Sequence, residues 1–573
     1  MERGRGGPSA VRGLLAAGAL VLASGCSGAG ASPGSAGSPS PGSAVAYPTC
    51  PAPTGSGLTY TIGLLDGSGH PSGPQTIADF PHWNDLQGGD VVCIYGRSAP
   101  YAERLILTRS GSDDGHRIRI VGVLQGGYPP VLTGKGATTA AAFNYGAELA
   151  QYYEGGEVSV TGLDYGAPVA YLNIEGLTIQ GATTAEPGGT AQSPTYSVNS
   201  YSDPSLNGAA PGPWGCGAAG INLIRCDHIS IVHNRIRDND NGIFVNSNNG
   251  NTSSNVTVAY NHIYGNGVGS QSGPSNPGQC AFDSHGVYSE AENISYLANR
   301  FGALRQGQAV NLLKDRSSGL VVAYNLFEPD GSFEASLGDS LLVGSVPGPV
   351  GHLLDLVESY DPSVGFNTLG EVYDNVVAFG NIFFDDSAGA GADAGTTVPV
   401  HFGGDQGDPS VYRHHLHFFN NTVVARRDSS PDDDQFGWFE METGTDVGAW
   451  NNIFYASANA TASPQIFTLL NGYCYDEPCG TARLLGQNWN SPLFQTPGVN
   501  GADTSPSFVD LAHGDLHIAA DDPTIVGNGQ AGDAAYPADQ STVPLEYADF
   551  LSTVARPFTM SRIDLGAFGY PGP

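Results

Sequence analysis

Residues 296–301 read YLANRF and residues 322–327 read VAYNLF, and the same short pattern recurs through the middle of the chain. In each copy a short apolar stretch leads to an asparagine, with Ile, Phe or Val close behind. The copies place asparagines at Asn234, Asn261, Asn299, Asn325, Asn381, Asn421 and Asn451. Successive asparagines are 27, 38, 26, 56, 40 and 30 residues apart. The shortest gaps fit one coil of a parallel β-helix, and the longer gaps fit one or two coils that carry insertions.

Stacking explains why such a pattern repeats. One coil cannot bury its apolar side alone, and neighbouring coils complete a continuous core. An asparagine at the same turn of each coil can occupy a strained bend and hydrogen-bond to the coils above and below. We therefore predict an all-β, single-stranded parallel β-helix over residues 48–573. A β-sandwich or propeller with coincidental asparagine turns is the alternative.

The N-terminus has the order of an export signal. Arginines precede the short apolar run AAGALVLAS, and small residues follow it. The ending LASGC resembles a bacterial lipobox, so we expect residues 1–25 to be removed and Cys26 to be lipidated. Ala23 stands where a larger aliphatic residue is usual, which leaves ordinary signal cleavage and secretion as the alternative. Residues 26–47 have the composition of a flexible linker. We expect an exported monomer that meets the membrane only through this lipid.

Charge and cysteines narrow the class further. The formal net charge is -33, which argues against a nucleic-acid partner and requires a local basic patch for any anionic ligand. Seven cysteines follow Cys26, and an exported chain folds where disulfides form. The candidate pairs are Cys50 with Cys93, Cys474 with Cys479, and two of Cys216, Cys226 and Cys280, which leaves one odd thiol.

The stretch NLLKDRSS at 311–318 supplies such a patch. Lys314 is one of two lysines in 573 residues, and Arg316 lies two positions after it. Arg300 and Arg305 bring four of the 22 basic residues within positions 300–316. We expect these two arginines to contact neighbouring sugars of an anionic chain.

Alignment on the asparagines places other groups beside this pair. Tyr288 lies 11 residues before Asn299, and Lys314 lies 11 residues before Asn325. Tyr288 and Lys314 should therefore stack about one strand spacing apart, or ~4.8 Å. By the same count Glu290 stacks with Arg316, while His285 and Asp283 lie at the edge. The segment GHLLDLVESYD adds His352, Asp355 and Glu358.

These residue types suit attack beside the carboxylate of a uronic acid. Its C5 proton is weakly acidic and becomes removable when cations stabilise the enediolate that forms. Arg316 suits neutralisation, because its planar fork meets a carboxylate in two bonds. Lys314 suits the base, if neighbouring cations and burial lower its pKa. Tyr288 or His285 would protonate the leaving oxygen, and Asp355 would orient the pair.

The chain resembles the right-handed parallel β-helix proteins of the pectate-lyase-like superfamily. GGDVVCIYGRSAPYAERLILTRSGSDDGHRIRIVG is similar to its opening coils, and SPSFVDLAHGDLHIAADDPTIVGNG with RIDLGAFGY is similar to its closing coils. The resemblance implies insertions that wall one face, here expected in residues 182–220, 265–282 and 385–399.

The site resembles that of a bacterial group in which His-x-x-Tyr is followed by Lys-x-Arg and Leu-Asp-Leu. Alginate lyases and chondroitinase B also use a lysine and an arginine, but theirs come from separate coils. The resemblance implies a polysaccharide lyase acting by β-elimination on a uronic-acid polysaccharide. It allows calcium as a cofactor, although no counterpart of the calcium-binding acids of those enzymes is visible. The site therefore carries no metal in our assignment.

Several alternatives remain. Lys314 and Arg316 could form a solvated pair with Asp315 or Glu290. Return of the proton on the other face would make a C5-epimerase, and FDSHG loosely resembles an epimerase segment. Asp283, Asp355 and Glu358 could be the carboxylates of a glycoside hydrolase. His415 and His417 share one side of a strand and could bind a metal. A protein that only binds polysaccharide would show aromatic side chains along its groove instead.

Overall fold

The structure is a computed structural model, and the residues that it describes form many short ranges. They are 47–143, 155–162, 167–183, 185–190, 193–198, 218–247, 250–267, 284–304, 311–329, 350–359, 370–386, 398–427, 435–458, 466–470, 474, 477–484, 487–491, 506–511, 515–519, 522–530, 543–547, 552–556 and 563–570. The signal and linker with Cys26, the site candidates Asp283 and Arg305, and most of the three predicted insertions lie outside them.

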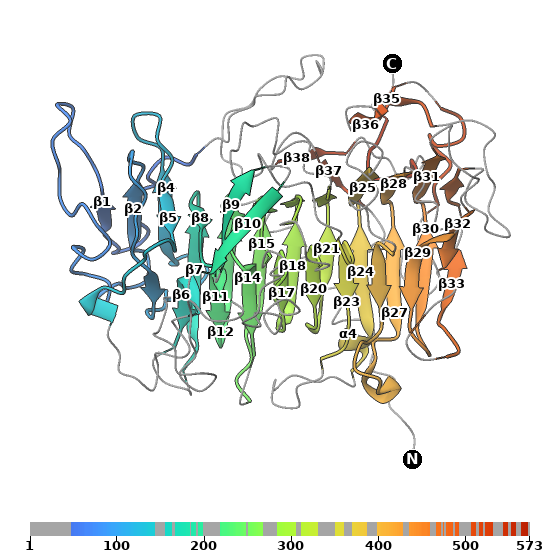
Figure 1. Cartoon of the computed structure of the whole chain (residues 1–573), viewed down its shortest axis with the longest axis horizontal. Coiled ribbons are helices and arrows are strands. Elements are labelled where there is room, and N and C mark those ends of the chain that lie inside the picture. The colour runs from blue at the N-terminus through green and yellow to red at the C-terminus, as the bar shows by residue number, and fades with distance from the viewer. Residues whose placement is uncertain are drawn as a thin grey trace.

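Three long sheets, each with all of its strands parallel, run the length of the molecule (Figure 1). Sheet I has 12 strands: β1 (Thr59–Ile62), β2 (Val91–Tyr95), β4 (Ile118–Val123), β7 (Val169–Glu175), β12 (Cys226–Val232), β15 (Ser254–Ala259), β18 (Glu292–Leu297), β21 (Val321–Ala323), β24 (Asn375–Phe379), β27 (His415–Phe419), β30 (Asp446–Trp450) and β33 (Thr481–Leu484). Sheet II has 10: β3 (Leu105–Leu107), β6 (Gly156–Thr161), β11 (Ala219–Ile224), β14 (Asn241–Asn246), β17 (Val287–Ser289), β20 (Leu313–Asp315), β23 (Leu354–Leu356), β26 (Val400–Phe402), β29 (Gln435–Met441) and β32 (Ile466–Leu470).

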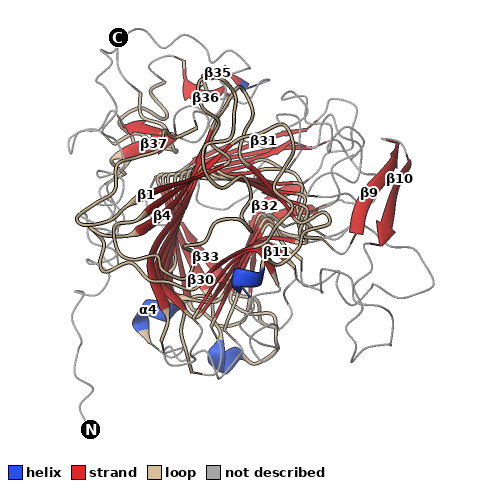
Figure 2. Cartoon of the chain, turned by 90° about the vertical axis from the view of Figure 1, so that its left-hand side faces the viewer, coloured by secondary structure: helices blue, strands red, loops and turns tan. Residues whose placement is uncertain are grey.

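Sheet III completes each coil, so the chain passes from sheet II to sheet I to sheet III and back. Its 10 strands are β5 (Val131–Thr133), β8 (Thr178–Gln180), β13 (Arg235–Arg237), β16 (His262–Tyr264), β19 (Arg300–Phe301), β22 (Leu326–Phe327), β25 (Ile382–Asp386), β28 (Thr422–Arg427), β31 (Ile453–Ala458) and β34 (Trp489–Asn490). The predicted right-handed parallel β-helix is confirmed. Viewed along its axis, the strands of each sheet lie behind one another around one core (Figure 2).

Small elements lie outside the three sheets. They are the antiparallel pairs β9 (Ala185–Thr190) with β10 (Ser193–Val198), β35 (Phe508–Asp510) with β36 (Asp515–Ile518) and β37 (Leu545–Tyr547) with β38 (Thr553–Ala555), the helix α4 (Glu371–Asp374), and the 3-10 turns η1 (Ala141–Phe143) and η4 (Pro409–Val411). Among the described residues, no helix is long and apolar enough to cross a membrane.

The repeated asparagines form a buried ladder at the bend between sheet I and sheet III. The Asn325 Oδ1 accepts from the backbone N–H of Asn299 at 2.9 Å and from its side-chain amide at 3.0 Å. Asn325 in turn donates to the Asn381 Oδ1 and to the Tyr296 carbonyl. The strained residue is the one before each asparagine, for example Tyr324 with φ +59°. The side-chain amide satisfies the backbone groups that this left-handed bend exposes.

One position of the ladder is corrected by the structure. Thr422 pairs with Ile453 in the sheet, so the partner of Asn421 is Asn452 rather than the predicted Asn451. Asn451 has φ +57° and occupies the strained position instead. The ladder continues to Asn488, which the sequence pattern did not reveal.

The C-terminal segment corrects a second expectation. Residues 89–122 do form an opening coil, but residues 506–530 add no strand to the three sheets. Instead β35 and β36 pair with each other, and Leu516, Ile525 and Phe568 pack against β25, β28 and β31. The segment thus covers the outer face of sheet III rather than closing the helix with another coil.

Two of the expected disulfides are confirmed. Cys50 is bonded to Cys93, and Cys474 is bonded to Cys479. Cys226 is a buried free thiol, so it is the odd cysteine. Cys216 and Cys280 lie outside the described residues.

Candidate functional site

One row of side chains projects outward from sheet II across six neighbouring strands. Side chains alternate along a strand, so Leu313 and Asp315 face the core while Lys314 faces out. Tyr288 pairs with Lys314 in the register, which confirms the predicted stacking. The outward row in strand order is Phe244, Tyr288, Lys314, Asp355, His401 and Glu440.

Lys314 is clasped by two carboxylates. Its Nζ donates to the Oδ2 of Asp355 at 2.5 Å and to the Oδ2 of Asp405 at 2.7 Å, and its side chain is 12% exposed. Burial works to lower the pKa of Lys314, but Asp355 and Asp405 outweigh it and raise the pKa above its ordinary value. The expectation that its pKa is lowered is therefore wrong for the free protein. Lys314 is a fixed ammonium here rather than a base.

Arg316 binds the same Asp405 carboxylate with the end of its guanidinium. Its NH2 lies 2.9 and 2.8 Å from the two oxygens of Asp405, its NH1 donates to the Glu358 carbonyl at 2.6 Å, and its Nε donates to the Tyr288 hydroxyl at 3.2 Å. Burial works against the charge, yet Tyr288 and Asp405 raise the pKa of Arg316 above its ordinary value. The guanidinium is thus fixed on three sides with its charge retained.

Asp405 belongs to the tight turn FGGDQG that follows β26. The buried Glu358 carboxylate accepts both the Asp405 and the Gln406 backbone N–H at 2.8 Å, which anchors this turn. A Cβ on Gly404 would lie 2.0 Å from the Tyr412 ring, so the turn packs closely on its other side. Burial raises the pKa of the Asp405 carboxyl, but Lys314 and Arg316 hold it below its ordinary value.

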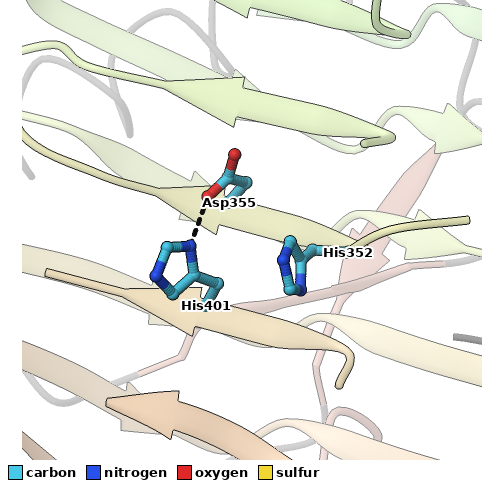
Figure 3. Close-up of side chains that lie close together, drawn as sticks. All are labelled: His352, Asp355 and His401. Atoms are coloured by element: carbon cyan, nitrogen blue, oxygen red, sulfur yellow. Dashed lines mark hydrogen bonds and ion pairs between the residues drawn. The ribbon is translucent and has the colours of Figure 1, made fainter. Parts of the chain in front are cut away.

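Asp355 connects Lys314 to a buried histidine (Figure 3). Its Oδ2 accepts from Lys314 and from the Asn311 side-chain amide at 2.5 Å, while its Oδ1 lies 2.7 Å from the His401 Nδ1. Burial would raise the pKa of Asp355, but Lys314 and the His401 hydrogen bond hold it well below its ordinary value. The predicted orienting role of Asp355 fits these contacts.

His401 is the group that the sequence did not single out. Its Nε2 lies 3.4 Å from the Glu442 carboxylate, and its side chain is 3% exposed. Burial would lower the pKa of His401, but hydrogen bonds with Asp355 and Glu442 raise it to about 10. The row thus alternates in charge: ammonium, carboxylate, imidazolium, carboxylate.

His285 does not fit the predicted role of proton donor. Its Nδ1 accepts the Asn311 backbone N–H at 3.2 Å, and its ring lies edge-on to Tyr288. Burial and then Lys314 lower its pKa to about 3, so the ring is neutral and held in place. It positions Asn311 and Tyr288. On the other side of Tyr288, the half-buried Phe244 contacts it with ring centroids 5.5 Å apart.

The remaining predicted residues divide clearly. Glu290 continues the register opposite Arg316, but its carboxylate accepts from the Ser359 hydroxyl at 2.6 Å. Arg300 lies on β19 in sheet III and pairs with Glu328, so the structure does not bring it to the site. The bland pairing of the two cations with Asp315 is wrong too, because Asp315 faces the core and meets Arg413 at 3.3 Å.

Metal binding was tested against donor geometry. His352, Asp355 and His401 bring three donor atoms within 4.8 Å, as do His401, Glu440 and Glu442. The 2.7 Å between Asp355 and His401 is a hydrogen-bond length, shorter than two ligands of one ion usually approach. Calcium prefers oxygen ligands alone, and both groups contain imidazole. His415 and His417 instead contact Asp446 and Asn375.

The comparisons with known proteins agree on the fold. No protein-family model and no curated protein matches the sequence. Among solved structures, an alginate lyase from Paenibacillus sp. str. FPU-7 is 14% identical over 73% of this chain and 99% of its own, with a TM-score of 0.39. Pectate lyase Pel9A is 14% identical over 90% and 96%, with a TM-score of 0.41. The GH136 lacto-N-biosidase from Eubacterium ramulus is 13% identical over 75% and 68%, with a TM-score of 0.32.

The class that the fold defines is the pectate-lyase-like parallel β-helix, as the sequence resemblance implied. These matches concern the path of the backbone. The function is argued below from the side chains on sheet II.

Proposed function

We propose that the protein is a polysaccharide lyase that cleaves an acidic, uronic-acid polysaccharide by β-elimination on the outer face of sheet II. The observation that carries this proposal is the Asp405 carboxylate, which Arg316 and Lys314 hold together beside the Tyr288 hydroxyl. A uronate carboxylate has the same planar group, so the two cations can hold it in the same way.

The cations then act on the carboxylate, and Tyr288 moves the proton. In the proposed step a phenolate oxygen of Tyr288 takes the C5 proton, and the electron pair forms the C4–C5 double bond as the C4–O bond breaks. The proton then passes to the leaving oxygen, so no other reactant is consumed. Lys314 and Arg316 stabilise the negative charge that develops on the carboxylate. The Arg316 Nε–H, 3.2 Å from the phenol oxygen, stabilises the phenolate.

Absorbance near 235 nm, where an unsaturated uronate absorbs, tests this. The protein is incubated with alginate, pectate, glucuronan and glycosaminoglycans, with and without calcium. We expect a rise with one of them, and a drop of roughly 10²–10⁴-fold in Tyr288→Phe, the usual contribution of a proton-transfer group. Lys314→Ala should lose roughly 10²–10³-fold in kcat, and Lys135→Ala, at the other lysine, should lose nothing. New reducing ends without absorbance would reject the lyase.

A glycoside hydrolase is the second candidate, because Asp355 and Asp405 both contact the Lys314 Nζ and so lie close together. One carboxyl of a hydrolase pair must be protonated, with a raised pKa. Here the pKa of both carboxyls is lowered. Glu358, the other predicted acid, has a raised pKa from burial and then Asp405, but both its oxygens accept backbone N–H groups. The lyase therefore fits better.

We also propose that the chain is exported and held at the cell surface through Cys26. The two disulfides support export, because such bonds persist in oxidising compartments. The polysaccharide substrate of the proposed reaction would also be met there.

A further inference from the structure

The two cations that the proposed reaction needs are already occupied. Asp405 gives both of its oxygens to Arg316 and one to Lys314. With Asp355 also on Lys314, the cluster presents no surplus positive charge to an incoming anion. A substrate carboxylate can bind to both cations only by replacing the Asp405 carboxylate.

The surroundings allow the side chain to leave while the backbone stays. The turn is anchored by Glu358 through the Asp405 and Gln406 N–H groups, and it packs against Tyr412 at Gly404. The Asp405 side chain is 18% exposed, the most exposed of the four charged groups in the cluster. Rotation about its own side-chain bonds therefore brings the carboxylate to water without unfolding the turn.

We infer that Asp405 occupies the substrate's carboxylate subsite in the free protein and acts as a specificity-determining residue. This inference rests on the proposed function for the identity of the site but not for its reaction. A uronate replaces one planar carboxylate by another, and the Arg316 and Lys314 contacts are kept. A neutral sugar offers no group in exchange, so Asp405 stays in place and excludes it. The substrate class is thus a carboxylate-bearing sugar rather than a neutral one.

Self-occupation lowers the affinity for every such ligand. When only a fraction of the protein is competent to bind, the apparent Kd rises by the inverse of that fraction. A tethered carboxylate competes at a high effective concentration, so we expect Asp405→Asn to bind acidic ligands on the order of 10–100-fold more tightly. The amide keeps the size of the side chain and removes the charge that Arg316 and Lys314 hold.

The two lysines provide a direct readout. Lysine-selective ¹³C labelling gives one Cε signal for Lys314 and one for the exposed Lys135 as an internal control. Wild type, Asp405→Asn and Asp408→Asn are titrated with acetate, tri-galacturonate, tri-mannuronate and a hyaluronan tetrasaccharide, each sugar beside its carboxyl-reduced form. Asp408 is the matched control, because it lies in the same turn and caps η4 by accepting from the Ser410 N–H.

We expect the Lys314 signal to move with acidic probes only, at lower concentration in Asp405→Asn, while Asp408→Asn behaves as wild type. Unchanged or weaker binding in Asp405→Asn, or no response of its Lys314 signal to any carboxylate, would overturn the inference. Tighter binding without any unsaturated product would instead reject the proposed lyase and leave the subsite established.

Discussion

The charge on His401 controls how the stability of the protein should depend on pH. This imidazole lies between Asp355 on β23 and Glu442 after β29, with Glu440 beside it in the register and the His352 ring at 5.1 Å. Burial opposes its charge, but the hydrogen bonds with Asp355 and Glu442 raise its pKa to about 10. Because the folded pKa lies above the unfolded pKa of about 6.5, the stabilisation is full below pH 6.5 and is lost as the pH rises through about 10.

The magnitude follows from the size of this shift. Each unit between the two pKa values corresponds to about 1.4 kcal/mol, so the free energy of unfolding should fall by about 2–3 kcal/mol between pH 7 and pH 9. Few other shifted groups act in that window. Burial, with neighbouring cations, lowers the pKa of His285 and His352, which titrate below it. Burial raises the pKa of Cys226 to about 12, so its effect begins above pH 9.

Equilibrium unfolding in urea at pH 7, 8 and 9 measures this, with His401→Gln compared with wild type. The variant should be less stable at pH 7 and should lack the loss toward pH 9. His415→Gln is the control, since that imidazole is exposed on sheet I and pairs with Asp446. Equal slopes for wild type and His401→Gln would refute the ionised Lys314–Asp355–His401 row on which the site description depends.

Three further predictions concern the ladder, the site and the N-terminus. Asn325→Ala should lower the free energy of unfolding by about 2–4 kcal/mol, because it removes the amide's four hydrogen bonds and leaves the buried Asn299 N–H unpaired, whereas the exposed Asn84→Ala should cost little in the same urea titration. Arg316→Lys should lower kcat/KM roughly 10²–10³-fold in the absorbance assay, since one ammonium cannot contact Asp405 or a uronate, Tyr288 and the Glu358 carbonyl together. Cys26→Ser should abolish incorporation of labelled palmitate in cells and release the protein from the membrane fraction, and retention there would contradict the lipid anchor.

The fold could be predicted because one interaction repeats at a fixed place in every coil. The ladder asparagine satisfies a bend that each coil must make, so its spacing reports the coil directly. Where the coil has no insertion, the same count also gives the register of the outward row, as the pairing of Tyr288 with Lys314 shows. The single error, Asn451 for Asn452, arose where two asparagines are adjacent and only strand pairing decides between them.

Insertions explain why half of the site was missed. Asp405 lies 91 residues after Lys314, and no described ladder spacing relates the two. Residues 330–349 and 387–397 separate the strands that carry Lys314, Asp355 and His401, so counting from the asparagines fails there. The signal that remains is the short sequence HFGGDQG, in which a strand ends in a glycine-rich turn that bears one acid.

The charge balance of the chain gives the deeper reason. With 55 acidic and 22 basic side chains, a cation that becomes buried has far more acids than open water around it. Burial of an unpaired charge is costly, so folding places a carboxylate on each buried cation unless the cation stays exposed. Lys314 and Arg316 are buried, and the sequence expectation of an open basic patch was therefore incompatible with their burial. A strongly acidic protein can still hold an acidic ligand at such cations by exchange, with the ligand's carboxylate taking the position of its own.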